Sequence, residues 1–539
     1  MIFASFVYLK WRQPNVPMTA RNTTVVADAN APAITQLLAE FVASHPSKGW
    51  SDAVEAQAHR TFANWAGCAV GPSTHETMEA ALGAVKELAP SAQAAVLGRS
   101  DRVDMANVAL LNGISSHTFD FDDTHLKTII HPAGPVASAI LALGEHLGSS
   151  GRQLIDALVL GVEVSCRVGN AVYPNHYDRG WHITGSTGML GSAAACSRLL
   201  GLNAKQTQMA LGIAASQPVG LREQFGTMTK PFHPGGAAKV GLMSALMAKH
   251  GYTSSARALE APRGLMQVFS DKTDWKEITE NLGKTWEIEL NTYKPFACGI
   301  VIHPAIDACV QLREKHNLKP DQVAKVTLKA HPLVQELTGK KTPTDGLLAK
   351  FSVFHSCAVA LIYGRAGEHE YTDDVVRSPL VIGVRGKVEL IVDRSIHEAS
   401  VDVTVETTDG LLAKFSVFHS CAVALIYGRA GEHEYADDVV RSALGIGVRD
   451  KVDLIVDRSV HEASVDVTVE TTDGQKHHIY IERAIGSLEK PMSNEQLKAK
   501  FVDQSTPSLG AQKTEEAWNL CMSLATQKDL KALLKSLTQ

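Results

Sequence analysis

Cysteine is scarce in this 539-residue sequence, and its eight cysteines never form a CxxC pair. Zinc knuckles and iron–sulfur clusters need closely spaced thiolates, so neither kind of site is expected. No apolar run reaches the roughly 18 residues of a membrane-spanning helix, so we expect no membrane partner. A basic run is also lacking, and 52 lysines and arginines face 57 aspartates and glutamates, so we expect no nucleic acid as a partner.

Motifs for common cofactors are missing as well. The sequence has no GxxxxGK[ST] loop, no GxGxxG segment after a strand, no HExxH pair and no GxSxG elbow. Nucleotide, dinucleotide, zincin and α/β-hydrolase chemistry therefore have no support in the sequence.

Apolar patterns that are typical of helices fill the first half of the chain. Between Ile34 and Val42, apolar residues recur at spacings of three and four, which places them on one face of a helix. Stretches rich in Ala, Leu and Gly follow at 136–147, 153–164, 188–200 and 237–250. Because small residues let helices pack closely, we predict an all-helical domain over 30–285. Residues 1–29 are expected to form a disordered extension.

The pattern changes near residue 285 to the alternation of half-buried strands. Valines and leucines alternate with other residues at 326–328, 388–392 and 401–405, and a helix-length apolar stretch lies at 351–364. We therefore predict a smaller α+β lid domain over 286–489. The last segment, 490–539, has a helical pattern and is expected to pack back onto the first domain. The expected fold class is mainly α.

The predicted lid contains a tandem duplication. Residues 344–407 and 408–471 are the same 64-residue unit and differ at six positions. Solenoids use shorter units in longer arrays, so two long copies indicate either a recent segmental duplication or an error in the gene model. We expect the second copy to add no chemistry. Because both copies compete for one place in the lid, the extra copy must bulge out, pair or stay partly disordered.

The densest polar cluster is HTFDFDDTH at 117–125, followed by His131. Its carboxylates, hydroxyls and imidazoles offer a general acid and a general base in one place. A divalent cation held by Asp120, Asp122 and Asp123 is a second interpretation. A solvated loop that caps the next helix is a third.

Three further segments are suited to an anionic substrate. His182 precedes a helix of small residues, whose N-terminal end attracts carboxylates. Lys230 and His233 lie three residues apart in a segment that Pro and Gly would fix as a turn. Lys294 lies at the junction of the two predicted domains, where a cleft is common. The structural alternatives are a buried core histidine, a solvated surface turn and a plain linker.

Taken in this order, the segments resemble the MmgE/PrpD family, which includes 2-methylcitrate dehydratase and cis-aconitate decarboxylase. The resemblance is carried by HTFDFDDTH…HP (117–132), DRGWH (178–182), GTMTKPFHPGGAA (226–238), YKPFACGIVIHPAID (293–307) and AKFSVFHSCAVAL, which occurs at 349–361 and 413–425. It implies a cofactor-independent lyase with no bound metal. It also implies a helical domain, a lid, an active site between them and a homodimer.

The same resemblance assigns site residues. The candidate catalytic residues are Asp120, Thr124, His131, His182 and Lys230. The candidate substrate-binding residues are Asp123, His233, Lys294 and His303. In citrate-type chemistry, lysines and protonated histidines would bind carboxylates and stabilise an enolate-like charge, while Asp120 and His131 would share the acid and base roles.

We therefore predict a lyase that acts on a small citrate-like acid, with the dehydration of 2-methylcitrate or a related alkylcitrate favoured. Decarboxylation of cis-aconitate to itaconate is the main alternative, and it is disfavoured because segment 331–341 has no counterpart of the lid tyrosine of the decarboxylases. A metal-dependent hydratase and a catalytically silent homologue that binds or assembles are further alternatives. The expected compartment is the cytoplasm, or the mitochondrion in a eukaryote.

Overall fold

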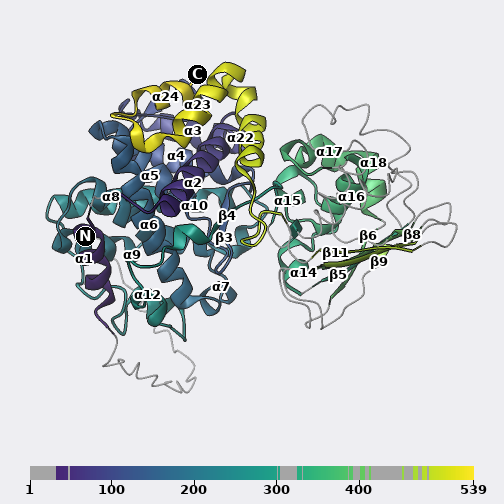
Figure 1. Ribbon diagram of the computed structural model, residues 1–539, viewed down its shortest axis with the longest axis horizontal. Coiled ribbons are helices and arrows are strands. Elements are labelled where there is room, and N and C mark those ends of the chain that lie inside the picture. Colours follow the sequence, from purple (N-terminus) through teal and green to yellow (C-terminus); the bar gives the residue numbers. More distant parts are fainter. Residues whose placement is uncertain are drawn as a thin grey trace, which may run out of the picture.

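The computed structural model describes residues 32–46, 49–299, 302–303, 325–330, 332–363, 365–386, 388–392, 401–406, 412–413, 452–453, 465–470, 476–481 and 485–539. Figure 1 shows a large helical part, here called the body, beside a smaller part with a sheet, here called the lid. The mainly helical fold predicted from the sequence is confirmed. The boundaries predicted near 285 and 490 stay a prediction, and the predicted extension 1–29 lies outside the described residues.

The body is formed by helices from both ends of the chain. Its N-terminal helices are α1 (Ile34–Ser44), α2 (Asp52–Val70), α3 (Glu76–Glu87), α4 (Met105–Thr118), α5 (Ala133–Leu147), α6 (Gly151–Val172), α7 (Asn175–Asp178), α8 (Ile183–Leu199), α9 (Ala204–Ala215), α10 (Thr229–Lys249), α11 (Leu265–Phe269) and α12 (Lys276–Thr279). Its C-terminal helices are α22 (Asn494–Leu509), α23 (Ala511–Met522) and α24 (Lys531–Leu537). Short 3₁₀ turns lie at Arg222–Gln224, Glu287–Leu290 and Leu524–Thr526.

Small residues set the spacing of the central helices. A Cβ atom on Gly113 of α4 would lie 2.5 Å from the Cα of Gly235 of α10, so only glycine permits this crossing. The crossing brings the end of α4, with His117, toward the start of α10, with Lys230. Helix α10 packs against α4 and α8, and α8 packs against α6, which together form the centre of the body.

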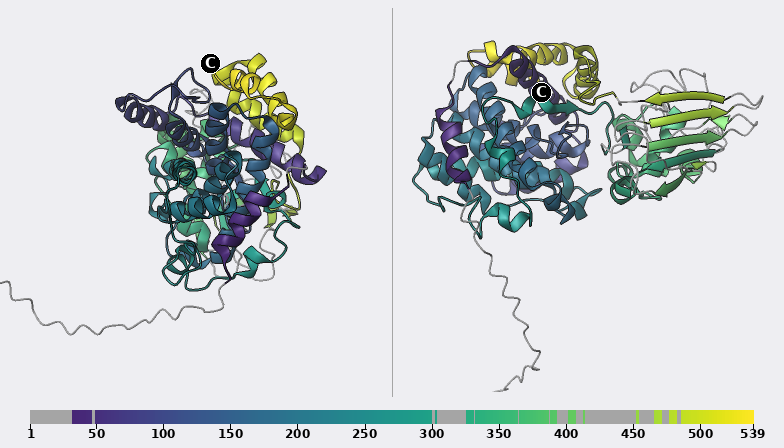
Figure 2. Two further views of the ribbon diagram at one scale, coloured as in Figure 1. Left: turned by 90° about the vertical axis from the view of Figure 1, so that its left-hand side faces the viewer. Right: turned by 60° about the horizontal axis from the view of Figure 1, so that its bottom comes forward.

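The C-terminal helices complete the hydrophobic core of the body. Phe501 of α22 and Trp518 of α23 are buried in the same cluster as Phe62 of α2. A Cβ atom on Gly67 would lie 2.9 Å from the ring of Phe501, so α2 and α22 are in close contact. Both views of Figure 2 show these helices against the body.

The lid contains a seven-stranded sheet with helices on one face (Figure 1). The strand order is β11, β10, β8, β7, β9, β5, β6, with bounds β5 Lys325–Ala330, β6 Val388–Val392, β7 Val401–Glu406, β8 Leu412–Ala413, β9 Val452–Asp453, β10 Val465–Glu470 and β11 Lys476–Ile481. The lid helices are α14 (Pro332–Thr338), α15 (Gly346–Ala349), α16 (Val353–Tyr363), α17 (Asp373–Arg377) and α18 (Pro379–Arg385), with a 3₁₀ turn at Glu368–Tyr371.

Both copies of the duplication contribute strands to this sheet. β7 from the first copy and β10 from the second have the same sequence, VDVTVE, and pair in parallel with Val403 opposite Val467. Of the three outcomes expected for the extra copy, pairing is therefore the one that its described strands show. Residues 414–450 of the second copy lie outside the described residues.

Two short antiparallel pairs connect segments of the body: β1 (Ala94–Ala95) with β2 (Arg102–Val103), and β3 (Asp123–His125) with β4 (Asn291–Tyr293). The second pair places Asp123 opposite Tyr293, next to Lys294. Across the described ranges, no helix is both long enough and apolar enough to cross a membrane.

Candidate active site

A small cavity of about 30 Å³ lies where the lid meets the body. It has room for a few waters at most, so a citrate-sized acid needs more space than the described side chains leave there. The body contributes Asp120, Ile129, His131, Tyr177, His182, Phe225, Lys230 and Lys294, and Gly299, Leu337, Thr338 and Phe351 complete the lining. Five predicted site residues therefore meet in one place.

Asp120 is the electrostatic centre of this cavity. It follows α4 with φ +51°, in the left-handed region that a non-glycine residue seldom adopts. Its Oδ1 accepts hydrogen bonds from the ammonium groups of Lys230 at 3.0 Å and Lys294 at 2.6 Å. Burial alone would raise the pKa of Asp120, but the two lysines outweigh burial and hold it well below its usual value. Asp120 is therefore a fixed carboxylate.

The two lysines respond differently to the same carboxylate. Burial lowers the pKa of Lys230, although Asp120 opposes that shift. For Lys294 the carboxylates of Asp120 and Asp122 outweigh burial and raise the pKa. Because Asp122 is also ionised, the two lysines and the two carboxylates balance in charge. Each ammonium group has a hydrogen left to donate, and these free donors favour a substrate with several carboxylates.

His117 links Lys230 to Asp122, and the sequence analysis did not select it as a site residue. Its Nε2 lies 2.9 Å from Lys230 Nζ, and its Nδ1 lies 2.7 Å from Asp122 Oδ2. Since an ammonium group can only donate, Nε2 accepts and the Nδ1–H donates to Asp122. Burial lowers the pKa of His117, so the ring is neutral at pH 7. The glycines at 113 and 235 are the only trace in the sequence of the helix crossing that brings His117 to Lys230.

His131 presents one ring nitrogen to the cavity. Its Nδ1 lies 2.6 Å from the carbonyl oxygen of Asp123 and 3.3 Å from Thr124 Oγ1. Because the carbonyl accepts, Nδ1 carries the proton, and the Nε2 lone pair remains available for acid–base chemistry. Burial lowers the pKa of His131 to about 3. Thr124 is thus a neighbour that orients the histidine.

His182 forms the N-cap position of α8, at the helix start that the sequence predicted. Its Nδ1 lies 2.8 Å from Nδ1 of His233, so one ring donates and the other accepts. Burial, followed by His233, holds the pKa of His182 well below its usual value. Phe225 contacts the His182 ring edge-on, with ring centroids 5.0 Å apart.

Three predicted substrate-binding residues are not among those that line the cavity. Asp123 Oδ2 accepts hydrogen bonds from the amide of Ala133 at 3.1 Å and from Asn291 Nδ2 at 2.8 Å, which fixes it at the start of α5. His233 lies behind His182. His303 lies 3.3 Å from the carbonyl oxygen of Cys298. Contact of these three with substrate stays a prediction.

Two structural expectations are wrong. The solvated-loop interpretation of 117–125 fails because Asp120 is 3% exposed and Asp122 and Asp123 are fully buried. The turn expected around Lys230 and His233 is the first part of α10, which begins at Thr229 and continues through Pro234. Pro231 is tolerated because it lies in the first turn, where backbone N–H groups have no helical partner, whereas Pro234 lies inside the helix.

The aspartate trio considered as a cation site is not brought together, because Asp123 is bonded to α5. Among the described residues, two other groups have ligand atoms within 4.8 Å of one another: His117, His131 and His182, and His117, Asp120 and Asp122. In the second group, His117 and Asp120 already bind Lys230, and Asp122 binds His117, so these hydrogen bonds fit acid–base chemistry.

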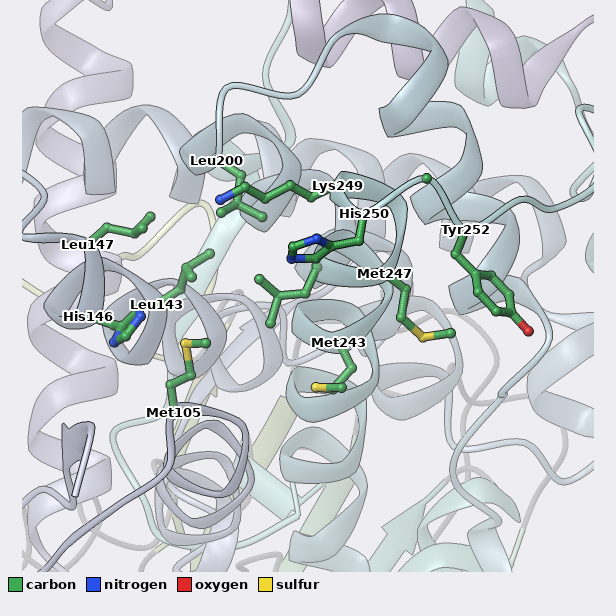
Figure 3. Close-up of a pocket in the computed structure, with 12 residues that line it drawn as sticks. Met105, Leu143, His146, Leu147, Leu200, Met243, Met247, Lys249, His250 and Tyr252 are labelled. Atoms are coloured by element: carbon green, nitrogen blue, oxygen red, sulfur yellow. The ribbon is translucent and has the colours of Figure 1, made fainter. Parts of the chain in front are cut away.

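A larger cavity of about 700 Å³ lies elsewhere on the body, at the ends of α5, α8 and α10. Figure 3 shows that methionine and leucine side chains surround it, among them Met105, Leu143 and Met243. No carboxylate lines it, so it lacks the paired charges of the small cavity. Size alone would have selected the wrong place for the chemistry.

The chain matches the MmgE/PrpD N-terminal domain over residues 36–278 and the MmgE/PrpD C-terminal domain over 296–411 and again over 396–524. These matches together cover most of the sequence. The chain belongs to the MmgE/PrpD family. The double match to the C-terminal domain reflects the duplication, since each match contains most of one copy.

Curated relatives in the MmgE/PrpD family are decarboxylases. A cis-aconitate decarboxylase-like protein of Aspergillus oryzae is 28% identical over 363 residues, 62% of this chain and 75% of that protein. Cis-aconitate decarboxylase of Homo sapiens is 29% identical over 309 residues, 55% of this chain and 63% of the enzyme. Cis-aconitate decarboxylase of Aspergillus terreus is 28% identical over 298 residues, which are 51% of this chain and 60% of the enzyme. The matched region spans under two thirds of the last two enzymes. The chain is a lyase of this family.

Proposed function

We propose that this lyase removes a carboxyl group from cis-aconitate or a closely related unsaturated tricarboxylate. The observation that carries the proposal is the composition of the cavity. One set of lining residues is titratable and cationic, including Lys230 and Lys294, while Phe225, Leu337 and Phe351 form an apolar set. Decarboxylation starts from an anion and releases a neutral, apolar molecule, and the two sets suit these two species.

The cationic residues would hold the remaining carboxylates. Lys230 and Lys294 share one oxygen of Asp120, and Asp120 Oδ2 makes no hydrogen bond. A bound carboxylate would therefore find two ammonium groups that share one carboxylate oxygen and can each donate a further hydrogen bond. As the carbon–carbon bond to the leaving carboxyl breaks, its electron pair shifts through the double bond toward a neighbouring carboxylate, and the ammonium groups stabilise the developing enolate-like charge.

A proton must then be added to carbon, and His131 is the residue placed to deliver it. Its Nδ1–H is fixed by the carbonyl of Asp123, so only Nε2 exchanges a proton with the cavity. The pKa of about 3 belongs to the cavity without an anion. A tricarboxylate raises that pKa, because the negative charges stabilise the imidazolium, and the histidine can then act as an acid.

The apolar residues would exclude water during this step. Phe225 and Phe351 lie with ring centroids 5.6 Å apart, and Lys230 Nζ lies 5.4 Å and 5.0 Å from the two centroids. With water excluded, the attraction between the lysines and the developing charge is stronger. The curated relatives named as cis-aconitate decarboxylases support the same reaction.

Dehydration of 2-methylcitrate is the second candidate. It is favoured by the absence of tyrosine from 331–341, because Thr338 is the polar residue that this segment contributes to the cavity. A tyrosine does line the cavity, but it is Tyr177 of α7 in the body. In dehydration, neutral His131 would remove the carbon-bound proton and a lysine would protonate the leaving hydroxyl.

Proton NMR of chelator-treated protein separates these candidates. The protein is incubated in parallel with cis-aconitate and with 2-methylcitrate, and a Lys230→Met variant serves as the control. The two methylene protons of itaconate from cis-aconitate are the expected result. A new olefinic product from 2-methylcitrate alone would replace the first proposal by the second. Silence with both acids would favour the homologue without catalytic activity, and activity that disappears with chelator would favour a metal-dependent hydratase.

The homodimer that the family resemblance implies remains a prediction. Size-exclusion chromatography with light scattering would give the mass of the protein in solution. The expected value is twice the 57.9 kDa of one chain. A mass of one chain would contradict it. The compartment predicted from the sequence also stays a prediction.

A further inference from the structure

Three successive backbone carbonyls beside the active site each accept a hydrogen bond from a different buried lysine. In the loop 119–121, Lys350 Nζ lies 2.9 Å from the first carbonyl oxygen, Lys294 Nζ lies 3.0 Å from the second, and Lys500 Nζ lies 2.5 Å from the third. The three lysines come from the lid, from the segment after β4 and from α22. The loop that carries Asp120 is thus held from three directions.

The two outer lysines also join this loop to the segment that carries Lys294. Lys350 Nζ lies 3.2 Å from the carbonyl oxygen of Ala297, and Lys500 Nζ lies 2.8 Å from that of Lys294. Each ammonium group therefore bridges one carbonyl of 119–121 and one of 294–297. Asp120 and Lys294, which form the 2.6 Å ion pair of the active site, lie between the two bridges.

These lysines are unusual because they are buried without touching the cavity. Lys350 is 2% exposed and Lys500 is 7% exposed, and neither lines the cavity. Burial lowers the pKa of Lys500 to about 8. An ammonium group is expensive to bury, and here backbone carbonyls and an aromatic face offset that cost: Lys500 Nζ lies 4.1 Å from the ring centroid of Phe121.

The loop needs this support because Asp120 has a positive φ. A non-glycine residue in that conformation is strained and persists only where the surroundings hold it. In this conformation Asp120 Oδ1 reaches both active-site lysines. If φ relaxed to a negative value, the carboxylate would turn away from one or both of them.

We propose that Lys350 and Lys500 are positioning residues that hold Asp120 in its active conformation, and that Lys350 makes this conformation depend on lid closure. The dependence on lid closure follows from the position of Lys350 in the sequence. Lys350 forms an ion pair with Glu368 within the lid, and its neighbour Phe351 lines the cavity. When the lid closes, Phe351 therefore reaches the cavity at the same time as Lys350 reaches the carbonyl of Phe119. The catalytic consequence rests on the proposed function, whereas the positioning itself does not.

The sequence allows this positioning to be observed directly. The chain has 15 phenylalanines, but Phe-Asp occurs only at 119–120 and 121–122. Protein labelled with ¹³C at the phenylalanine carbonyl and with ¹⁵N at aspartate therefore gives two signals in a carbonyl-to-amide correlation spectrum. These signals report the first and third carbonyls of the loop, which are the partners of Lys350 and Lys500.

Methionine in place of each lysine removes the ammonium group and keeps the length of the side chain. Lys500→Met is expected to shift the carbonyl signal of Phe121 upfield, and Lys350→Met that of Phe119. Because the second copy carries the same lysine at 414, Lys350→Met is also made together with Lys414→Met. Lys513→Met is the matched control, since Lys513 Nζ donates to the carbonyl of Thr538, 2.8 Å away, at the C-cap of α24.

Turnover supplies the second measurement, with whichever acid the lyase converts. The lysine variants are expected to lower kcat roughly 10- to 100-fold, because an error of about 1 Å in a catalytic group has that effect, and to change KM less. Lys513→Met should leave both values unchanged. The proposal is overturned if both carbonyl signals stay in place in the lysine variants, or if the signals shift while kcat is unchanged. Failure of the proposed substrate alone would leave the carbonyl shifts intact, so the two failures can be told apart.

Discussion

The body and the lid contribute unlike groups to one cavity. The titratable side chains that line it, Asp120, His131, Tyr177, His182, Lys230 and Lys294, all come from the body. From the described part of the lid come Leu337, Thr338 and Phe351, none of which changes charge at ordinary pH. The groups suited to acid–base chemistry therefore lie in the body, while the lid contributes groups suited to exclude water.

This division shows in the hydrogen bonds as well. Each cavity-lining histidine of the body has its Nδ1 bonded to another body residue: His131 to the carbonyl of Asp123, and His182 to His233. The carbonyl fixes the tautomer of His131, and both Nδ1 contacts lie within the body. What the lid adds is Lys350, which acts on backbone, and Phe351, which covers Lys230. Four predictions test whether the catalytic groups lie in the body alone and whether the lid only covers the cavity.

The largest effect is expected from Lys230→Met in the body. It removes one of two ammonium groups that stabilise the developing charge, so kcat/KM should fall roughly 10²- to 10³-fold. Lys249→Met, at the exposed end of the same helix, is the matched control. Proton NMR of substrate conversion gives both rates. A loss no greater than that of the control would remove the catalytic role of Lys230.

The second effect concerns the stability of the body. Burial raises the pKa of Asp123 to about 7, above its unfolded value of about 3.9. The folded protein therefore keeps a proton that the unfolded chain releases, and this contribution to stability is lost as pH rises from about 4 to 7. Asp123→Asn has no such proton. Relative to the parent, its free energy of unfolding should rise over that range by up to about 4 kcal/mol.

Urea unfolding at several pH values measures this difference, and Asp529→Asn on the body surface is the control. If the difference between Asp123→Asn and the parent did not change with pH, Asp123 would titrate normally. Burial of the Asp123 carboxyl would then not lower the stability of the body as pH rises.

A smaller effect is expected from Phe351→Ala in the lid. The ring lies over Lys230, and losing a desolvated contact of this kind, about 1 to 2 kcal/mol, should lower kcat/KM roughly tenfold. Phe232→Ala is the matched control, because Phe232 is 43% exposed on α10. Steady-state kinetics in parallel with Lys230→Met compare the two regions. Equal losses in the lid and body variants would show that the lid takes part in the chemistry.

The smallest effect is expected from deleting residues 408–471. The deletion joins the first copy directly to the strand β11 and removes β10, whose sequence β7 repeats. Turnover should stay within roughly threefold of the parent, as for other changes away from a site. Deleting 344–407 instead leaves nearly the same sequence and should behave alike. A large loss in either deletion would assign a function to both copies.

The sequence predicted much of the site because its motifs are short and continuous. Asp120, His131, His182, Lys230 and Lys294 were selected from clusters of polar residues beside helices, and the fold brings all five together. The helical class followed from periodicity, because apolar residues at spacings of three and four form one face.

What sequence reasoning missed depends on contacts between distant elements. His117 belongs to the polar cluster at 117–125 but was not selected as a site residue, and only the crossing of α4 with α10 places it 2.9 Å from Lys230 Nζ. Lys500 lies far from every motif and reaches the site only because α22 packs against α2. The supposed turn at Lys230 was misjudged because Pro and Gly also suit the beginning of a closely packed helix.

The register of the lid sheet has a consequence for the length of the chain. Val403 and Val467 are 64 positions apart and lie side by side, and the described strands of the second copy, β8, β9 and β10, join the same sheet as β7 of the first. Loss or gain of one whole unit changes the chain by 64 residues and keeps the reading frame. The lid sheet is thus a place where this chain can change its length by a fixed step.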